Sequence, residues 1–248
     1  MGQRPRRRPG TAAVVVAALA IAAAGWTLGG AWPGARSAAP SAARAGAPSA
    51  APVDKAATAD PLDFDLNGDG FADLVVGAPG EAIGPVAGAG AVQVIRGSAN
   101  GPTATGNQIW SQDTAGVAGA AEARDRFGDS VASGDFDSDG YADLAIGVPG
   151  EAIGTIAGAG MVHVIHGTGS GLASIGSQVW HQDSAGVPGA CESGDRFGDT
   201  LAAGDVNGDG FDDLVIGSPG EGIGAVAHAG SVTLLRAGRT SPWAFPVR

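Results

Sequence analysis

The stretch DFDSDGYADLAIGVPGE, residues 135–151, is written almost identically three times in this chain and indicates how the chain folds. The other copies, DLNGDGFADLVVGAPGE and DVNGDGFDDLVIGSPGE, begin at Asp65 and Asp205, so successive copies are 70 residues apart. Further segments recur at the same spacing: AGAGAVQVIRG (87–97) as AGAGMVHVIHG (157–167), and DRFGDS (125–130) as DRFGDT (195–200). Tandem repetition on this scale is typical of one supersecondary unit stacked on copies of itself.

Each repeat contains short runs of β-forming residues separated by turns rich in Gly and Asp. In the second repeat four such runs cover residues 130–134, 144–147, 161–167 and 178–182. The third run alternates between two faces, Val162, Val164 and His166 on one and Met161, His163 and Ile165 on the other. No segment after residue 60 has sustained helical spacing. We therefore expect an all-β fold of propeller-type blades, each with four antiparallel strands.

The acidic segment at the start of each repeat predicts a calcium site. Positions 1, 3 and 5 place side-chain oxygens on one side of a curling loop, and Gly at position 6 permits the sharp turn. The backbone carbonyl of position 7 and the Asp at position 9 would complete a cage of hard oxygens suited to Ca²⁺ rather than Mg²⁺. The predicted ligands are Asp65, Asn67, Asp69, Phe71 and Asp73; Asp135, Asp137, Asp139, Tyr141 and Asp143; and Asp205, Asn207, Asp209, Phe211 and Asp213.

Two calcium loops of a different kind fit this pattern less well. EF-hand and dockerin-type loops close at position 12 and lead into a helix, but position 12 here is Val76, Ile146 or Ile216, inside an apolar run. Asx-rich turns without a metal remain the alternative. We expect the calcium ions to be structural, because nothing in the pattern indicates an open coordination position for catalysis.

Composition limits the location and the partners of the protein. Arg4, Arg6, Arg7 and Arg8 precede an apolar run at 11–25, so residues 1–31 resemble a signal peptide, with an uncleaved anchor as the alternative. Residues 32–60 are rich in Ala, Pro and Ser and are expected to form a disordered linker. The formal charge of −11, from 14 Lys+Arg and 25 Asp+Glu, argues against a nucleic-acid partner. Cys191 is the only cysteine, so no intrachain disulfide is possible.

The second repeat, FGDSVASGDFDSDGYADLAIGVPG (127–150), resembles an FG-GAP repeat of the kind found in the N-terminal β-propeller of integrin α subunits. FG occurs at 127–128 and 197–198, GAP at 77–79, and the variants GVP and GSP at 147–149 and 217–219. The resemblance implies a calcium loop between the first and second strands of each blade. It divides residues 61–237 into repeats 61–126, 127–196 and 197–237, followed by a divergent tail at 238–248.

The chain departs from a closed propeller at both ends of the repeat region. The positions of the first FG element, Ala57 and Thr58, fall in the linker, and the third repeat loses the pattern at RAGRTSPWAFPVR (236–248). We expect an incomplete propeller, either from a truncated gene product or because several chains associate to complete a ring. The chain has no integrin-like transmembrane tail or metal-dependent adhesion domain, so integrin function does not follow from the resemblance.

No catalytic group of residues is evident. His163, His166, His181 and His228 are each replaced by different residue types in the other repeats, so we expect them to be solvated. Trp110 and Trp180 are expected in the blade core rather than on a sugar-stacking surface. Glu81, Glu151 and Glu221 recur in phase either as surface turn residues or as a ligand-facing acidic ring.

These features predict an exported, secreted or cell-surface module that binds an extracellular protein or glycan and is not an enzyme. After signal cleavage it would not insert into a membrane. The expected binding rim comprises loops 81–90, 151–160 and 221–230 with interblade loops 112–126 and 182–196, opposite the acidic loops. Two alternatives remain: an accessory propeller domain of a secreted hydrolase or lyase whose catalytic part is absent from this chain, and a purely structural surface repeat.

Overall fold

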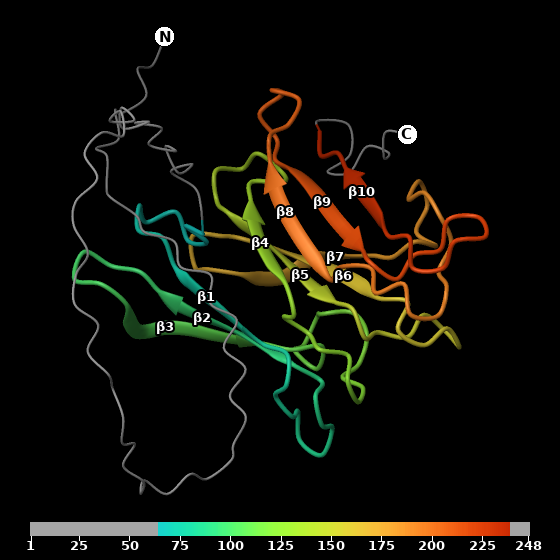
Figure 1. Ribbon diagram of the computed structural model, residues 1–248. Helices are drawn as coiled ribbons and strands as arrows, with labels where there is room; N and C mark the ends of the chain where they lie inside the picture. Colours follow the sequence, from blue (N-terminus) through green and yellow to red (C-terminus); the bar gives the residue numbers. More distant parts are fainter. Residues whose placement is uncertain (1–63, 239–248) are drawn as a thin grey trace, which may run out of the picture. The chain divides into compact units, whose positions relative to one another are not determined.

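The computed structural model describes residues 64–238, which form ten strands and no helix (Figure 1). The strands are β1 (Leu74–Ala78), β2 (Ala91–Arg96), β3 (Thr103–Trp110), β4 (Val131–Gly134), β5 (Asp143–Val148), β6 (Met161–His166), β7 (Ala173–Trp180), β8 (Thr200–Gly204), β9 (Asp213–Ser218) and β10 (Ser231–Leu235). The predicted signal peptide, the linker with Ala57 and Thr58, and all of the tail except Gly238 lie outside the described residues.

The strands form three separate antiparallel sheets, ordered β1-β2-β3, β4-β5-β6-β7 and β8-β9-β10, which we call the first, second and third blades (Figure 1). The all-β fold of propeller-type blades is confirmed. Among the described residues only the second blade has four strands, because the first blade has no counterpart of β4 and the third none of β7. Equivalent residues pair in all three, for example Ile146 with His163 and Ile216 with Thr233.

The strand boundaries follow local chemistry. β1, β5 and β9 each end one residue before a proline, which cannot donate a ladder hydrogen bond. The predicted fourth strand at 178–182 is wrong at both ends, because β7 covers Ala173–Trp180. A register shift between Val164 and His166 lets the start of β7 pair, and Gly176 takes a positive φ of 84° there.

Two apolar cores fill the spaces between the blades. β6 contributes to both, since Met161 and Ile165 pack toward the first blade while Val162 and Val164 pack toward the third. The predicted alternation along this strand is therefore confirmed. Trp110 lies in the first core, and the half-buried Trp180 packs against the second, as expected for core tryptophans.

The FG dipeptides lie where one blade meets the next. Phe127 and Phe197 are fully buried in the two cores and form parallel bridges to Gly90 and Gly160 of the preceding blades. A Cβ added at Gly77, the glycine of GAP, would lie 2.0 Å from the carbonyl oxygen of Gly128. The backbones of adjacent blades therefore touch at this point, and only glycine permits that approach.

The expectation that His163 is solvated is wrong. Its side chain is 0% exposed, and its ring lies 5.5 Å from the ring of Phe127. Burial lowers the pKa of His163 to about 4, and neither ring nitrogen has a hydrogen-bond partner. The in-phase Gln93 is exposed while Thr233 is buried, so burial here depends on whether a blade packs in front, not on the residue type.

Candidate metal centre

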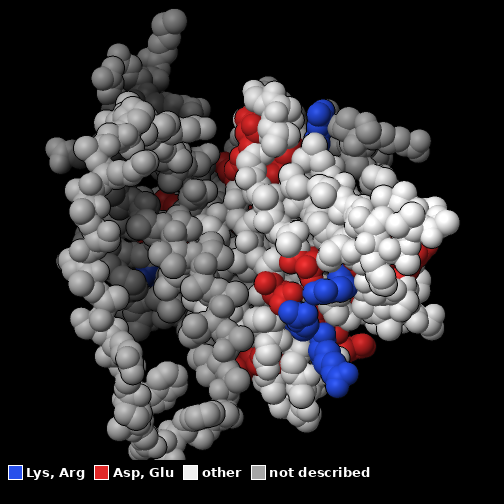
Figure 2. Space-filling model, in the orientation of Figure 1, with Lys and Arg blue, Asp and Glu red and all other residues white. Residues whose placement is uncertain are grey.

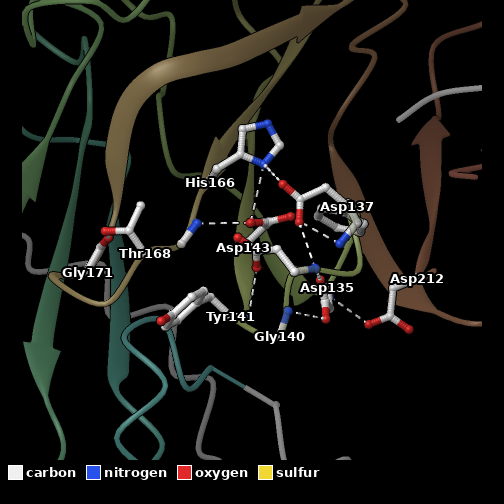
Figure 3. A network of polar contacts seen from close by, with 12 residues as sticks. Asp135, Asp137, Gly140, Tyr141, Asp143, His166, Thr168, Gly171 and Asp212 are labelled. Carbon is white, nitrogen blue, oxygen red and sulfur yellow. Dashed lines mark hydrogen bonds and ion pairs between the residues drawn. The ribbon is translucent and has the colours of Figure 1, made fainter. Parts of the chain in front are cut away.

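The three acidic loops, residues 65–73, 135–143 and 205–213, lie along one edge of the blades and are hydrogen-bonded in series. The Ala142 amide donates to the carbonyl of Asp65 at 3.2 Å, and the Asp212 amide donates to that of Asp135 at 3.0 Å. The Asp212 carboxylate in turn accepts the Asp135 amide at 2.8 Å (Figure 3). The second and third loops join β4 to β5 and β8 to β9, as the family resemblance implied.

Each loop is held by bonds from its own backbone to its own side chains. In the second loop the two oxygens of Asp135 accept the amides of Asp139 and Gly140, both at 3.0 Å. Asp137 also accepts from Asp139, at 3.1 Å, and Asp139 accepts the Tyr141 amide at 2.9 Å. The first and third loops repeat this pattern at 2.9–3.1 Å.

The glycine at position 6 has the predicted special backbone in every copy. Its φ is 89° at Gly70, 93° at Gly140 and 87° at Gly210. Side chains rarely adopt these values, so the sharp turn depends on glycine. The amides of the position-7 residues, Phe71, Tyr141 and Phe211, donate to the position-5 carboxylates. The proposed role of their carbonyls as ligands stays a prediction.

The ninth position is anchored in the blade. The carboxylates at position 9, of Asp73, Asp143 and Asp213, each accept through Oδ1 a backbone amide at 2.9–3.1 Å. The donating amides lie just beyond the ends of β2, β6 and β10. The second oxygen of Asp73 is buried and has no protein partner. An orphaned carboxylate oxygen of this kind fits a bound cation, because an unpaired buried charge is otherwise costly.

The carboxylates of the second loop converge on one point. One oxygen each from Asp135, Asp137 and Asp139 lie within 4.8 Å of one another, and a second set within 4.8 Å consists of Asp137, Asp143 and His166. Burial raises the pKa of Asp135 to about 6. The hydrogen bond from the Gly140 amide lowers this pKa, and the charge of Asp143 raises it. Burial also raises the pKa of Asp143. The loop thus gathers carboxylates whose ionised forms need a compensating charge.

Sequence reasoning missed His166, which it placed in solvent. His166 Nδ1 lies 3.3 Å from Asp143 Oδ1 and 3.5 Å from Asp137 Oδ2 (Figure 3). The in-phase residues Arg96 and Arg236 are also basic. Burial raises the pKa of Asp73 to about 6 and also that of Asp213, and the charges of these arginines partly offset both effects. A basic residue at this position in all three copies was the available signal.

The third loop is more open than the other two. Val206, its second residue, is 59% exposed, whereas the equivalent Leu66 and Phe136 are fully buried in the cores. Hydrogen bonds, chiefly from the Gly210 amide, lower the pKa of Asp205. The oxygen-rich side chains of all three loops can hold a divalent cation of the Ca²⁺ type.

The three in-phase glutamates have different environments. Glu151 is buried and accepts a 2.6 Å hydrogen bond from Gln112 Nε2 of the preceding repeat, and Glu221 accepts one from Gln182. Glu81 is exposed. Two of the three glutamates therefore tie one blade to the interblade loop that precedes it.

The Glu151 contact makes stability depend on pH. Burial raises the pKa of Glu151 from 4.5 to about 7, although the bond from Gln112 opposes this. Because the folded pKa is raised, the stabilising contribution is complete below about pH 4.5 and is lost as the pH rises through 7. We expect Glu151→Gln to be more stable than the native chain at pH 8.5 by about 1–2 kcal/mol, but not at pH 5.

Urea unfolding of the full chain at these two pH values measures this difference. Glu81→Gln, the exposed equivalent in the first repeat, is the matched control and should change neither value. Equal stability of Glu151→Gln and the native chain at pH 8.5 would contradict the assigned burial of the charge.

The sequence profile described as "FG-GAP repeat" matches residues 62–95, 127–165 and 197–235. The chain carries three FG-GAP repeats. Each match contains an acidic loop, the GAP-type glycine and most or all of β2, β6 or β10, so it spans the elements that build the candidate metal centre and the interblade contact.

The chain is similar in sequence to proteins of two kinds, phospholipases and integrin alpha subunits. The chain is 36% identical over 175 residues to the phosphatidylinositol-glycan-specific phospholipase D of Bos taurus, covering 67% of the chain and 20% of that protein. It is 34% identical over 160 residues to integrin alpha-3 of Cricetulus griseus, covering 62% and 13%. It is 35% identical over 158 residues to integrin alpha-PS5 of Drosophila melanogaster, covering 63% and 14%. The chain thus spans a fifth or less of the length of these relatives.

The FG-GAP blades are built from strands alone. In the described range, 64–238, no helix is long and apolar enough to cross a membrane.

Proposed function

We propose that this chain is an exported, calcium-stabilised FG-GAP module that binds an extracellular protein or glycan without catalysing a reaction. The observation that carries the proposal is the threefold repetition of one acidic loop, with the same internal hydrogen bonds and with direct bonds from loop to loop. Calcium held by the predicted ligands would neutralise the carboxylates at the edge where the blades join. Export is supported by the basic and apolar start of the sequence.

The rim opposite the acidic loops is the proposed binding surface. In each repeat the loop between the second and third strands forms a tight hairpin closed by a pair of reciprocal backbone bonds at 2.9–3.1 Å, as between Ile83 and Val86. The interblade loops pack against these hairpins, for example through the Arg124 amide to Ala87 at 3.1 Å. Each hairpin thus carries an apolar pair on a supported surface: Ile83 and Val86, Ile153 and Ile156, Ile223 and Val226. The pair of the third repeat is exposed, whereas the other four residues are half-buried and Ile153 packs against the first core.

Charge on the visible surface agrees with a protein or glycan partner. On the face in Figure 2 most of the described surface is uncharged. One cluster in the lower part of the view has basic and acidic side chains side by side, and a separate, mainly acidic group lies near the top. The ion pair between Arg126 and Asp129, at 2.6 Å, shows how neighbouring charges compensate. A polyanionic partner would favour a surface of one sign instead.

Binding of the calcium-loaded full chain to arrays of glycans and extracellular proteins tests the proposal. The triple variant Val86→Ser, Ile156→Ser, Val226→Ser should weaken any captured ligand at least about tenfold. The control, Ile109→Ser with Ile175→Ser, changes exposed isoleucines of the outer strands β3 and β7 and should bind normally. Equal loss in both variants, or no ligand on any array, would count against the rim.

An accessory role beside an enzyme is the second candidate. The phospholipase D of Bos taurus aligns over only 20% of its own length, so its relationship to this chain concerns a part of that protein. Under this alternative the chain would position a catalytic domain supplied elsewhere. Hydrolysis of a phosphatidylinositol-glycan substrate by the purified chain alone would overturn the non-catalytic role.

Self-association is proposed through the open face of the third blade. Val232 is 73% exposed there, whereas the equivalent Val92 and Val162 are fully buried by the following blade. A second copy of the chain could cover this face as a blade does. Sedimentation of the full chain should detect an oligomer that Val232→Asp reduces to monomer; a native chain that stays monomeric at high concentration would exclude this.

A further inference from the structure

A histidine, an aspartate and the single cysteine meet in the interblade loop that follows the second blade. His181 Nδ1, an Asp183 carboxylate oxygen and Cys191 Sγ all lie within 4.8 Å of one another. The separation of Cys191 Sγ from His181 Nδ1 is 3.8 Å. Cys191 is buried, His181 is half-buried and Asp183 is exposed, so solvent reaches the group at Asp183.

The loop that carries these residues is held in place by its own hydrogen bonds. The Cys191 amide donates to Asp183 Oδ1 at 3.0 Å, which fixes the two ends of the loop against each other. The His181 amide donates to Ser184 Oγ at 3.0 Å, and the Ser184 amide donates back to the carbonyl of His181 at 2.9 Å. The three side chains are therefore gathered by the backbone and do not depend on a metal for their placement.

The first repeat builds the same loop with different side chains. There the Ala121 amide donates to Asp113 Oδ1 at 2.9 Å, and the Ser111 amide donates to Thr114 Oγ1 at 2.9 Å. Ser111 stands in the place of His181 and Ala121 in the place of Cys191. The second repeat thus adds an imidazole and a thiol to a backbone that folds without them, so a structural need of the loop does not account for either.

We propose that His181, Asp183 and Cys191 bind a transition-metal cation of the Zn²⁺ class, with the fourth position open to water or to a ligand from a partner. Nitrogen and sulfur ligands favour such a cation, whereas the all-oxygen acidic loops favour Ca²⁺. In a tetrahedral site, metal–sulfur and metal–nitrogen bonds of ordinary length place those two atoms about 3.5 Å apart. The observed 3.8 Å requires a movement of only a few tenths of an ångström.

Metal binding at this site is a simple exchange of a proton for a cation. Burial raises the pKa of the Cys191 thiol, and the adjacent Asp183 charge adds to this, so the metal-free thiol keeps its proton at neutral pH. When the sulfur bonds to the metal, the thiol proton passes to the solvent and no oxidant or reductant is needed.

Titration of the reduced full chain with Co²⁺, in saturating Ca²⁺ so that the acidic loops are occupied, tests the proposal directly. One equivalent should produce the near-ultraviolet absorption of a cobalt–thiolate bond, and Zn²⁺ should remove it. Cys191→Ala should abolish the band, while His181→Ser and Asp183→Asn should each weaken Co²⁺ affinity at least about tenfold. The melting curve of each variant shows whether it is folded.

The first repeat supplies a test that does not depend on removing a side chain. The double variant Ser111→His, Ala121→Cys copies the second-repeat side chains onto the matching loop and should bind a second equivalent of Co²⁺ with its own thiolate band. Absence of a thiolate band in the native chain, or a Cys191→Ala variant that titrates like the native chain, would overturn the proposal. Co²⁺ uptake without that band would assign the ion to carboxylates and would overturn it as well.

Discussion

Chelation of calcium should lower the melting temperature of the full chain by roughly 10 °C. Extracellular calcium modules bind with Kd values of about 10⁻⁴ to 10⁻³ M. One site of about 10⁻⁴ M in about 1 mM Ca²⁺ stabilises the fold by about 1.4 kcal/mol, so three sites contribute about 4 kcal/mol. The loops lie where adjacent blades are bonded, as between Asp212 and Asp135, so losing the ions should weaken the junctions between blades.

The calcium effect should be larger at pH 7.5 than at pH 5. Burial raises the folded pKa of Asp73 and Asp135 from 3.8 to about 6. In the metal-free protein their stabilising contribution is complete below about pH 3.8 and is lost as the pH rises through 6. A bound cation compensates the ionised carboxylates and so restores the most stability where they are charged.

Melting curves with Ca²⁺ and with EDTA, at both pH values, measure these effects. Asp135→Asn with Asp139→Asn should remove part of the calcium-dependent gain, while Glu122→Gln, an exposed acid outside the loops, should keep all of it. If EDTA left the melting temperature unchanged at pH 7.5, the acidic loops would be turns and not metal sites.

Gly77→Ala and Gly147→Ala should each destabilise the chain by about 3 kcal/mol or more. An added Cβ would lie 2.0 Å from the carbonyl oxygen of Gly128 at the first position and of Gly198 at the second. Both obstacles are backbone atoms of the next blade, which cannot rotate away, so a blade would have to shift from its neighbour. The fully buried Phe127 and Phe197 would lose packing in the same movement.

The third repeat provides the matched control, because no further blade packs against it in the described residues. At Gly217 the nearest atom to an added Cβ is the Thr200 hydroxyl oxygen at 2.2 Å, which a side-chain rotation can move. Gly217→Ala should therefore cost much less than the other two in urea unfolding. Similar losses at all three positions would show that the cost lies within each strand and not between blades.

The nine-residue loops could be predicted from the sequence because their interactions are local. The carboxylate of Asp135 accepts amides four and five residues ahead, and Gly140 supplies the positive φ that this requires. The same local chemistry is present in each copy, so the spacing of carboxylates and glycine was sufficient to place them. Whether Ca²⁺ occupies the loops is the part that chelation will decide.

The strand register was also open to prediction, since alternation along β6 separates Val162 and Val164 from Met161 and Ile165. The fourth strand was misplaced because its start, ASIG (173–176), has no sustained apolar alternation and pairs through a bulge and Gly176. That pairing is set by the register of β7 on β6, which shifts between Val164 and His166.

Contacts between repeats were beyond the reach of sequence patterns. Whether His163 is buried, whether Glu151 meets Gln112 and whether His166 lies beside Asp143 all depend on residues distant in the chain. The repeat itself was misleading here, because identical positions in three blades have different neighbours: Val162 is covered by a following blade and Val232 is not. Local hydrogen bonding therefore specified the blade and its loops, while the packing of one blade on another set the burial, and with it the charge state, of the side chains between them.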